Sequence, residues 1–117
     1  MIALDPQDLH DAGLSQVLVL WDVGKATLEF KLSRAVVPGA SHAILACFDT
    51  SMLVFPRRKP WGDSDQVNTM SAEQRANGAA LIQIELQSGD VVVIECGRFE
   101  LQVSNSSSSP FVPGPPL

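Results

Sequence analysis

Several residue types are scarce or missing in this sequence, and each absence excludes a class of protein. Tyrosine is absent and only two cysteines occur in 117 residues, too few for the disulfide framework of a small secreted domain. Basic residues number 8 against 13 acidic ones, so the basic surface that nucleic acids and anionic membranes require is missing. No apolar run approaches the ~20 residues of a membrane span, and the acidic N-terminus does not resemble a signal peptide. We therefore expect a cytoplasmic protein with no nucleic-acid or membrane partner.

What remains is the composition of an ordinary globular domain. Apolar residues make up 45% of the chain and charged residues 18%, which is enough apolar material to build one core. Residues 1–103 are expected to form a single β-domain. Residues 104–117 form a Ser/Pro-rich tail, of flexible or polyproline type, that could dock on a neighbouring chain.

A first hairpin is predicted near the N-terminus. The apolar run Val17–Trp21 is followed by a glycine-containing turn at Val23-Gly24 and then by the strictly alternating run Lys25–Leu32. A two-residue turn would place Trp21 opposite Ala26. The core face would then carry Val17, Val19, Trp21, Ala26, Leu28, Phe30 and Leu32. The outer face would carry Thr27 and Glu29 together with Leu18 and Leu20, which something must cover.

A second hairpin is predicted by the alternation of Ala80–Leu86 and the favoured turn dipeptide Ser88-Gly89. A two-residue turn places Glu95 opposite Ile82 on the core face, where its carboxylate would have to be paired, hydrogen-bonded or turned outward by a bulge. The return strand is expected to run on from Val91 to Val103 with a bend at Gly97.

Two further strands are predicted at His42–Phe48 and Met52–Phe55, joined by a short turn. Helical turns are expected at Asp5–Gly13 and at Ser71–Gln74, where a capping-box pattern precedes a stop at Asn77-Gly78. The expected fold is mainly β: an antiparallel sandwich or partly open barrel of about six or seven strands with one or two short helices.

The best candidate for a ligand site lies between the hairpins. Cations beside an indole can hold a small anion, because guanidinium groups bind anions bidentately and the indole offers a stacking face. The alternative is a solvated loop in which the acidic side chains neutralise the cations and the indole covers the sheet. The residues concerned are Arg57, Arg58, Lys59, Trp61, Asp63 and Asp65, together with Pro60.

No set of residues points to catalysis, a metal or a cofactor. Asp63 and Asp65 have the spacing that begins a calcium loop, but its other ligands are missing. Cys47 and Cys96 lie in apolar runs and are expected to be buried, unbridged and unreactive. His42, within a strand, is expected to be structural.

Two short motifs carry a resemblance. Trp61-Gly62-x-Ser64-x-x-Val67-Asn68 precedes the acidic hairpin Glu85-Leu86-Gln87-Ser88-Gly89-Asp90. This arrangement resembles small uncharacterised bacterial proteins with a domain of unknown function. The resemblance implies a bacterial protein and transfers no activity or site residue.

The functional expectation follows from surplus apolar strand surface. The strands Val17–Trp21, Ala43–Phe48 and Met52–Phe55 are apolar on both faces, whereas an antiparallel sheet in a small domain usually has one wet face. We expect a non-catalytic domain that acts through protein contacts, as a homodimer or with another protein. The alternatives are that residues 56–78 cover the sheet, or that the protein binds or converts a small anionic ligand at the Arg57–Trp61 segment.

Overall fold

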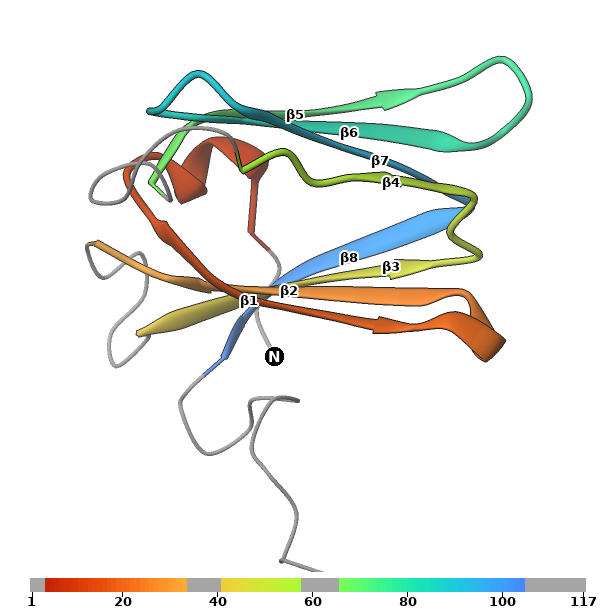
Figure 1. The fold of residues 1–117 in the computed structure, drawn as a ribbon, viewed down its shortest axis with the longest axis horizontal. Helices are drawn as coiled ribbons and strands as arrows, with labels where there is room; N and C mark the ends of the chain where they lie inside the picture. Colours follow the sequence, from red (N-terminus) through yellow and green to blue (C-terminus); the bar gives the residue numbers. More distant parts are fainter. Residues whose placement is uncertain (1–3, 34–40, 58–65, 105–117) are drawn as a thin grey trace, which may run out of the picture.

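The computed structural model describes residues 4–33, 41–57 and 66–104, and these form two stacked antiparallel sheets (Figure 1). The predicted antiparallel sandwich is confirmed, with eight strands in the described residues rather than six or seven. In chain order the elements are η1 (Pro6–Leu9), β1 (Gly13–Leu20), η2 (Trp21–Val23), β2 (Lys25–Lys31), β3 (His42–Phe48), β4 (Met52–Val54), β5 (Val67–Gln74), β6 (Ala80–Leu86), β7 (Val91–Cys96) and β8 (Arg98–Ser104).

Each sheet has four strands, in the orders β1-β2-β3-β8 and β4-β7-β6-β5. The chain passes between the sheets at one end, from β3 to β4 and from β7 back to β8 (Figure 1). At this corner the N–H of Gly97 donates to the carbonyl of Phe48 at 2.9 Å. A Cβ on Gly97 would lie 3.0 Å from the Cβ of Asp49, so only glycine fits without a shift. The predicted bend at Gly97 is confirmed, but it separates two strands of different sheets.

The core lies between the sheets and is built by alternate residues of the central strands. Each fully buried aliphatic or aromatic side chain stabilises the fold by about 1.5–3 kcal/mol relative to an exposed one. The largest of them are Leu28 and Phe30 on β2, Leu45 on β3, Ile82 and Ile84 on β6, and Ile94 on β7.

The N-terminal segment closes one end of this core. The predicted helical turn exists as η1, and the N–H of Asp5 donates to the Asp8 carboxylate at 3.0 Å. Leu9 is fully buried against the core cluster. Gly13 does not end a helix as predicted but opens β1. The two residues before it are already bonded to Val67, because the Asp11 N–H donates to the Val67 carbonyl and the Val67 N–H donates to the Ala12 carbonyl, both at 2.8 Å.

The first hairpin forms with a longer turn than predicted. Val19, not Trp21, lies opposite Ala26. The turn includes η2, in which the Gly24 N–H donates to the Trp21 carbonyl at 3.3 Å and Gly24 has φ +65°. Because the register moves by two residues, an even number, the predicted faces of β1 are kept. Trp21 itself leaves the sheet and is 87% exposed, so its predicted core position is wrong.

In the second hairpin the predicted two-residue turn is wrong, and this changes which face is buried. The Leu86 N–H donates to the Asp90 carbonyl at 2.9 Å, so three residues form the turn, with Gly89 at φ +96°. One added residue flips the return strand. Glu95 therefore lies opposite Leu81 on the outer face, where Ser51 Oγ donates to its carboxylate at 3.0 Å.

The outer face of β2 is oriented as predicted but is not solvated. Thr27 is 3% and Glu29 8% exposed. The register of β1 shifts between Leu14 and Gln16, which marks a bulge at Ser15. From there Ser15 Oγ donates to the Glu29 carbonyl at 3.0 Å and reaches the Glu29 carboxylate at 3.4 Å. Glu29 thus lies on the outer face, as predicted, but it is a buried side chain there and not a surface one.

The predicted helix at Ser71–Gln74 is also wrong, since these residues belong to β5 and pair with β6. A capping box is a local signal, and tertiary pairing overrides it. Asn77-Gly78 instead forms the hairpin turn: Asn77 Oδ1 accepts from the Ala79 N–H at 3.0 Å, and Gly78 has φ +88°.

Candidate functional site

Only one member of the predicted ligand segment falls within the described residues. Arg57, just after β4, lines a hollow between the sheets. The remaining candidates lie outside the described residues: Arg58, Lys59, Trp61, Asp63 and Asp65. The predicted tail, residues 105–117, also lies outside them.

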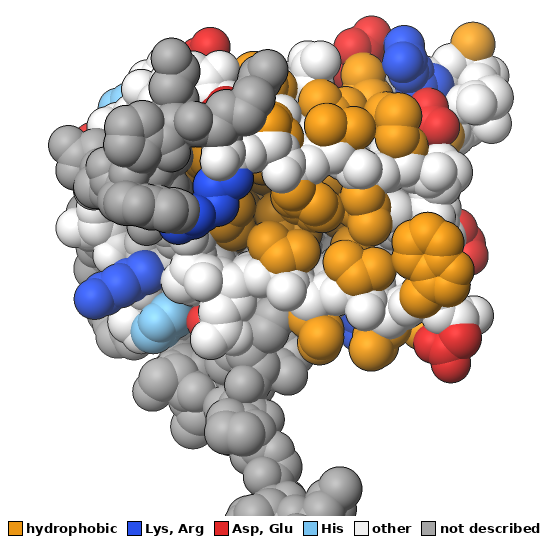
Figure 2. All heavy atoms as spheres, in the orientation of Figure 1, with side chains coloured by type: hydrophobic (Ala, Val, Ile, Leu, Met, Phe, Trp, Pro, Cys, Tyr) orange, Lys and Arg blue, Asp and Glu red, His pale blue; other side chains and the backbone are white. Residues whose placement is uncertain are grey.

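As far as the described residues go, the side of the sandwich bounded by the edge strands β1 and β4 is open. Figure 2 shows apolar side chains gathered in a band across this side, between the two sheets. Two hollows lie along it, and each is bounded by β1 or the turn after it on one sheet and by β4 or the residues beside it on the other. This is the candidate functional surface, and we call it the open side.

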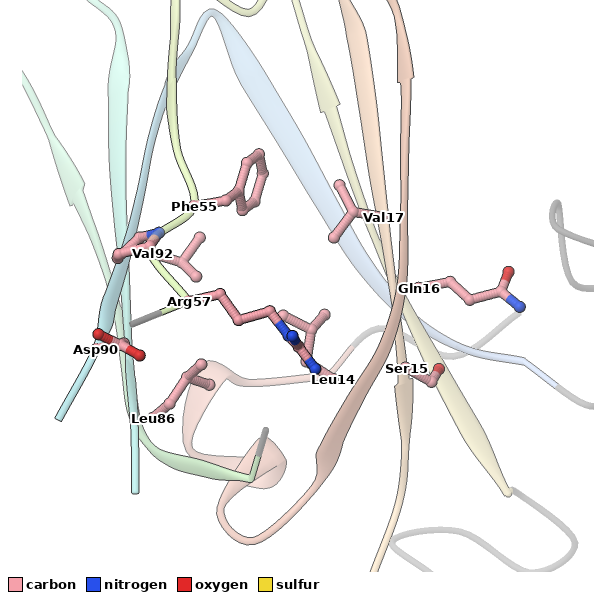
Figure 3. A pocket seen from close by; sticks show the side chains of 10 residues that line it. Leu14, Ser15, Gln16, Val17, Phe55, Arg57, Leu86, Asp90 and Val92 are labelled. Carbon is pink, nitrogen blue, oxygen red and sulfur yellow. The ribbon is translucent and has the colours of Figure 1, made fainter. Parts of the chain in front are cut away.

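The first hollow has a volume of about 220 Å³ and lies at the beginning of β1. Figure 3 shows Val17 and Phe55 facing each other across it, with the Arg57 side chain extended towards β1. Asp90 lines its wall and is 3% exposed, and the Ser88 hydroxyl donates to its carboxylate at 3.3 Å. The hollow therefore combines apolar walls with one cation and one held carboxylate.

The second hollow, of about 260 Å³, lies at the end of β1. Its lining includes Val19, Leu20 and Trp21 from one sheet and Met52 and Leu53 from the other. The turn after β1 is held here, because the Thr50 N–H donates to the Gly24 carbonyl at 2.9 Å. The indole is thus an exposed apolar group on a turn that is bonded to the connection between β3 and β4.

In the described part of the chain, the exposed large apolar side chains are confined to one region. Among the described residues, every large apolar side chain classed as exposed belongs to β1, to the turn after it, or to β4: Val17, Val19, Leu20, Trp21, Val23, Met52 and Val54. Isolated exposed apolar side chains are common on proteins, but a contiguous group marks an interaction surface. Sequence reasoning found the apolar excess of β1 and β4, but it placed Trp21 in the core.

The two cysteines are buried and unbridged, as predicted. Cys47 comes from β3 and Cys96 from β7. Burial raises the pKa of the Cys47 thiol far above its ordinary value, and a neighbouring Cys96 thiolate would raise it further. Burial also raises the pKa of Cys96, a hydrogen bond with Cys47 lowers it, and the Glu95 charge raises it. Thiols held protonated are poor nucleophiles.

A polar cluster that the sequence did not indicate lies beside η1. His10 Nδ1 is 2.8 Å from the Asn68 carbonyl, Asn68 Nδ2 donates to Glu85 at 2.9 Å, and Gln87 Nε2 donates to Asp11 at 2.7 Å. These bonds fix the η1 segment to β5 and β6. Within residues 4–33, 41–57 and 66–104, no group of three or more His, Cys, Asp or Glu side chains could hold a metal ion.

The second histidine, His42, is half-buried at the start of β3, with Nδ1 2.8 Å from the Ser41 hydroxyl oxygen. Both described histidines therefore have local hydrogen-bond partners.

Comparison with known proteins adds no relative: no family model matches the chain, and neither a curated protein nor a solved structure is significantly similar to it. The helical segments in the described part of the chain are all too short to span a membrane.

Proposed function

We propose that this protein is a non-catalytic domain that acts through protein contacts, as a homodimer, and that the open side is its contact surface. The observation that carries the proposal is that, among the described residues, the exposed large apolar side chains are confined to β1, the turn after it and β4. Such a surface on an isolated monomer leaves apolar area in water at about 25 cal/mol per Å². A second copy removes that cost on both partners at once.

Three other observations support a contact role over catalysis. Both thiols are buried and protonated. The two described histidines are engaged by neighbouring oxygen atoms. The apolar walls of the hollows suit side chains of a partner more than a polar substrate. Unbridged cysteines also fit the cytoplasm, which we propose as the location.

The test is the mass of the full chain in solution at micromolar concentration. We expect light scattering to give twice the chain mass of 12.6 kDa. Leu20→Asp should reduce it to 12.6 kDa, because a carboxylate then lies within the contact. The matched control is Gln83→Asp, which adds the same charge at an exposed position of β6 and should leave the mass doubled. A wild-type mass of 12.6 kDa would contradict the proposal.

A second candidate function is suggested by Arg57, whose guanidinium lies in the first hollow (Figure 3). There it could receive a small ligand with an anionic group and an apolar body. Thermal unfolding with nucleotides, sugar phosphates and carboxylates tests this, since a ligand at about 100 times its Kd stabilises by about 2.7 kcal/mol. A stabilisation that disappears in Arg57→Gln would support the ligand; an unchanged Tm across the panel would dismiss it.

A further inference from the structure

We infer that two copies of this chain join through β1 itself, as antiparallel neighbours in one continuous sheet, and that Trp21 of each copy faces the first hollow of the other. The inference rests on the proposed homodimer and specifies its geometry. β1 pairs with β2 on one side, and on its other side only Gly13, its first residue, is bridged, to Gln66. Among the described residues, alternate residues beyond Gly13 therefore offer outward N–H and C=O groups that an added strand can satisfy.

β1 is suited to meet its own copy because it carries no charge. Gly13–Leu20 contains no acidic or basic residue over eight positions. Two copies meeting around a twofold axis bring the same residues together, so a charged edge would bring like charges close to each other. An uncharged apolar edge avoids this repulsion, even though each copy has a net charge of −5.

The other three edges of the described sheets carry features that oppose such pairing. β8 includes the ion-paired Arg98 and Glu100, and its Leu101 carbonyl already accepts from the Leu4 N–H at 2.9 Å. β5 carries Glu73 and an irregular register near its start. β4 is only three residues long. Charge, coverage, irregularity and shortness are the usual protections of sheet edges. Within the described residues, β1 has only its bulge and the bridge between Gly13 and Gln66 at its start.

Symmetry and the bulge together determine the register. The twofold axis is perpendicular to a continuous antiparallel sheet, so core-facing residues must oppose core-facing residues and one residue must oppose itself. The regular part of β1 beyond the bulge is Gln16–Leu20, and its midpoint is Leu18. Gln16 then lies opposite Leu20 of the second copy, and Val17 opposite Val19. The two valines, each 39% exposed, meet at the axis on the core side.

In this register Leu20 lies opposite Gln16 of the second copy, so Trp21, which follows Leu20 and leaves the sheet, comes beside the first hollow, which Ser15 and Gln16 help to line. That hollow, about 220 Å³, exceeds the roughly 150 Å³ that accepts a benzene ring in an apolar protein cavity. In this hollow Phe55 can make an edge or face contact with an indole ring, and the Arg57 guanidinium can make a cation–π contact with it. Each copy supplies one indole and one hollow, so the two contacts are identical.

Cysteine cross-linking tests the register. Directly opposed residues of antiparallel strands have Cα atoms about 4.5–5.5 Å apart, within the range of a disulfide. Leu18→Cys alone should therefore give a disulfide dimer on incubation with oxidised glutathione, which takes up the two electrons and two protons released. Gln16→Cys should cross-link only when mixed with Leu20→Cys. Gln83→Cys is the matched control and should stay monomeric on non-reducing gels.

Tryptophan fluorescence tests the hollow. In a Trp61→Phe variant, Trp21 is the one remaining indole, and its emission should shift to shorter wavelength as the protein concentration rises through the dimer range. Leu20→Asp should keep the emission at the wavelength of an exposed indole at all concentrations.

The outcomes separate the two proposals. A doubled mass without a Leu18→Cys cross-link overturns the β1 pairing and leaves the homodimer standing. A single-chain mass overturns both. A cross-link at Leu18 without a Trp21 shift overturns the placement of the indole in the hollow and supports the strand pairing.

Discussion

The two buried thiols make the stability of this protein depend on pH in a defined direction. In the unfolded chain a cysteine ionises near pH 8.5, whereas burial raises the pKa of both Cys47 and Cys96 in the folded protein. Stability is therefore full below about pH 8.5 and falls as the pH rises towards the folded pKa, because only the unfolded state gains by ionisation. At pH 9.5, one unit above the unfolded pKa, the loss from Cys47 is about 1.4 kcal/mol, and the raised pKa of Cys96 adds to this loss.

Urea unfolding at pH 7 and pH 9.5, with a reducing agent present, measures this loss. With a slope of about 1–3 kcal/mol per M of urea, the loss from Cys47 alone lowers the midpoint by roughly 0.5–1.4 M, and Cys96 lowers it further. Lysines also begin to lose their protons in this range. The control is therefore the double variant Cys47→Ala/Cys96→Ala, whose midpoint should fall less than that of the wild type by the amount that the thiols contribute. An equal fall in both proteins would show that the thiols ionise in the folded state and are not held protonated.

Three further predictions concern the fold. Phe30→Ala should destabilise by about 3–5 kcal/mol in urea unfolding, since the side chain is fully buried between the sheets. Glu29→Ala should lower the urea midpoint more than Glu100→Ala. The reason is that Glu29 is 8% exposed and accepts a hydrogen bond from Ser15, whereas Glu100 is exposed. Equal midpoints of the two variants would contradict the burial of Glu29. Gly89→Ala should reduce Tm because Gly89 has φ +96°, although an added Cβ would meet no atom within 4 Å. Gly13→Ala is the control: an added Cβ has open space there and φ is not positive, so Tm should be nearly unchanged.

The sequence predicted the strands better than the turns that join them. Alternation of apolar residues identified β2 and β6, and β3 was predicted with its observed bounds. Periodicity reports which residues share a face within one strand, so the core faces of β2 and β6 followed directly. It does not report the number of residues in a turn.

That number decided the main errors. Glycine at Gly24 and Gly89 indicated turns correctly, but each turn is longer than two residues. An even change of register kept Val17 and Val19 on the core face, whereas an odd change turned Glu95 outward. The helix predicted at Ser71–Gln74 failed for a different reason: pairing with β6 lies outside any local motif.

The open side was predicted only in part. Apolar strands with too little cover indicated a contact surface, but which side stays open depends on strand order. β1 and β4 border the open side because each is an edge strand of its sheet. Strand order cannot be read from a local sequence pattern. Trp21 is a candidate contact residue because it lies on the turn after β1, which leaves the sheet and exposes the indole. No sequence pattern indicates this.

The most direct test of the account is amide hydrogen exchange of the full chain at two protein concentrations, one well below and one well above the dimer range. We predict that amides of Gln16–Leu20 that point away from β2 exchange slowly at the high concentration and quickly at the low one. Amides of β6, which has neighbours on both sides, should exchange alike at both. Concentration-independent exchange along β1 would contradict a contact surface on this side of the sandwich.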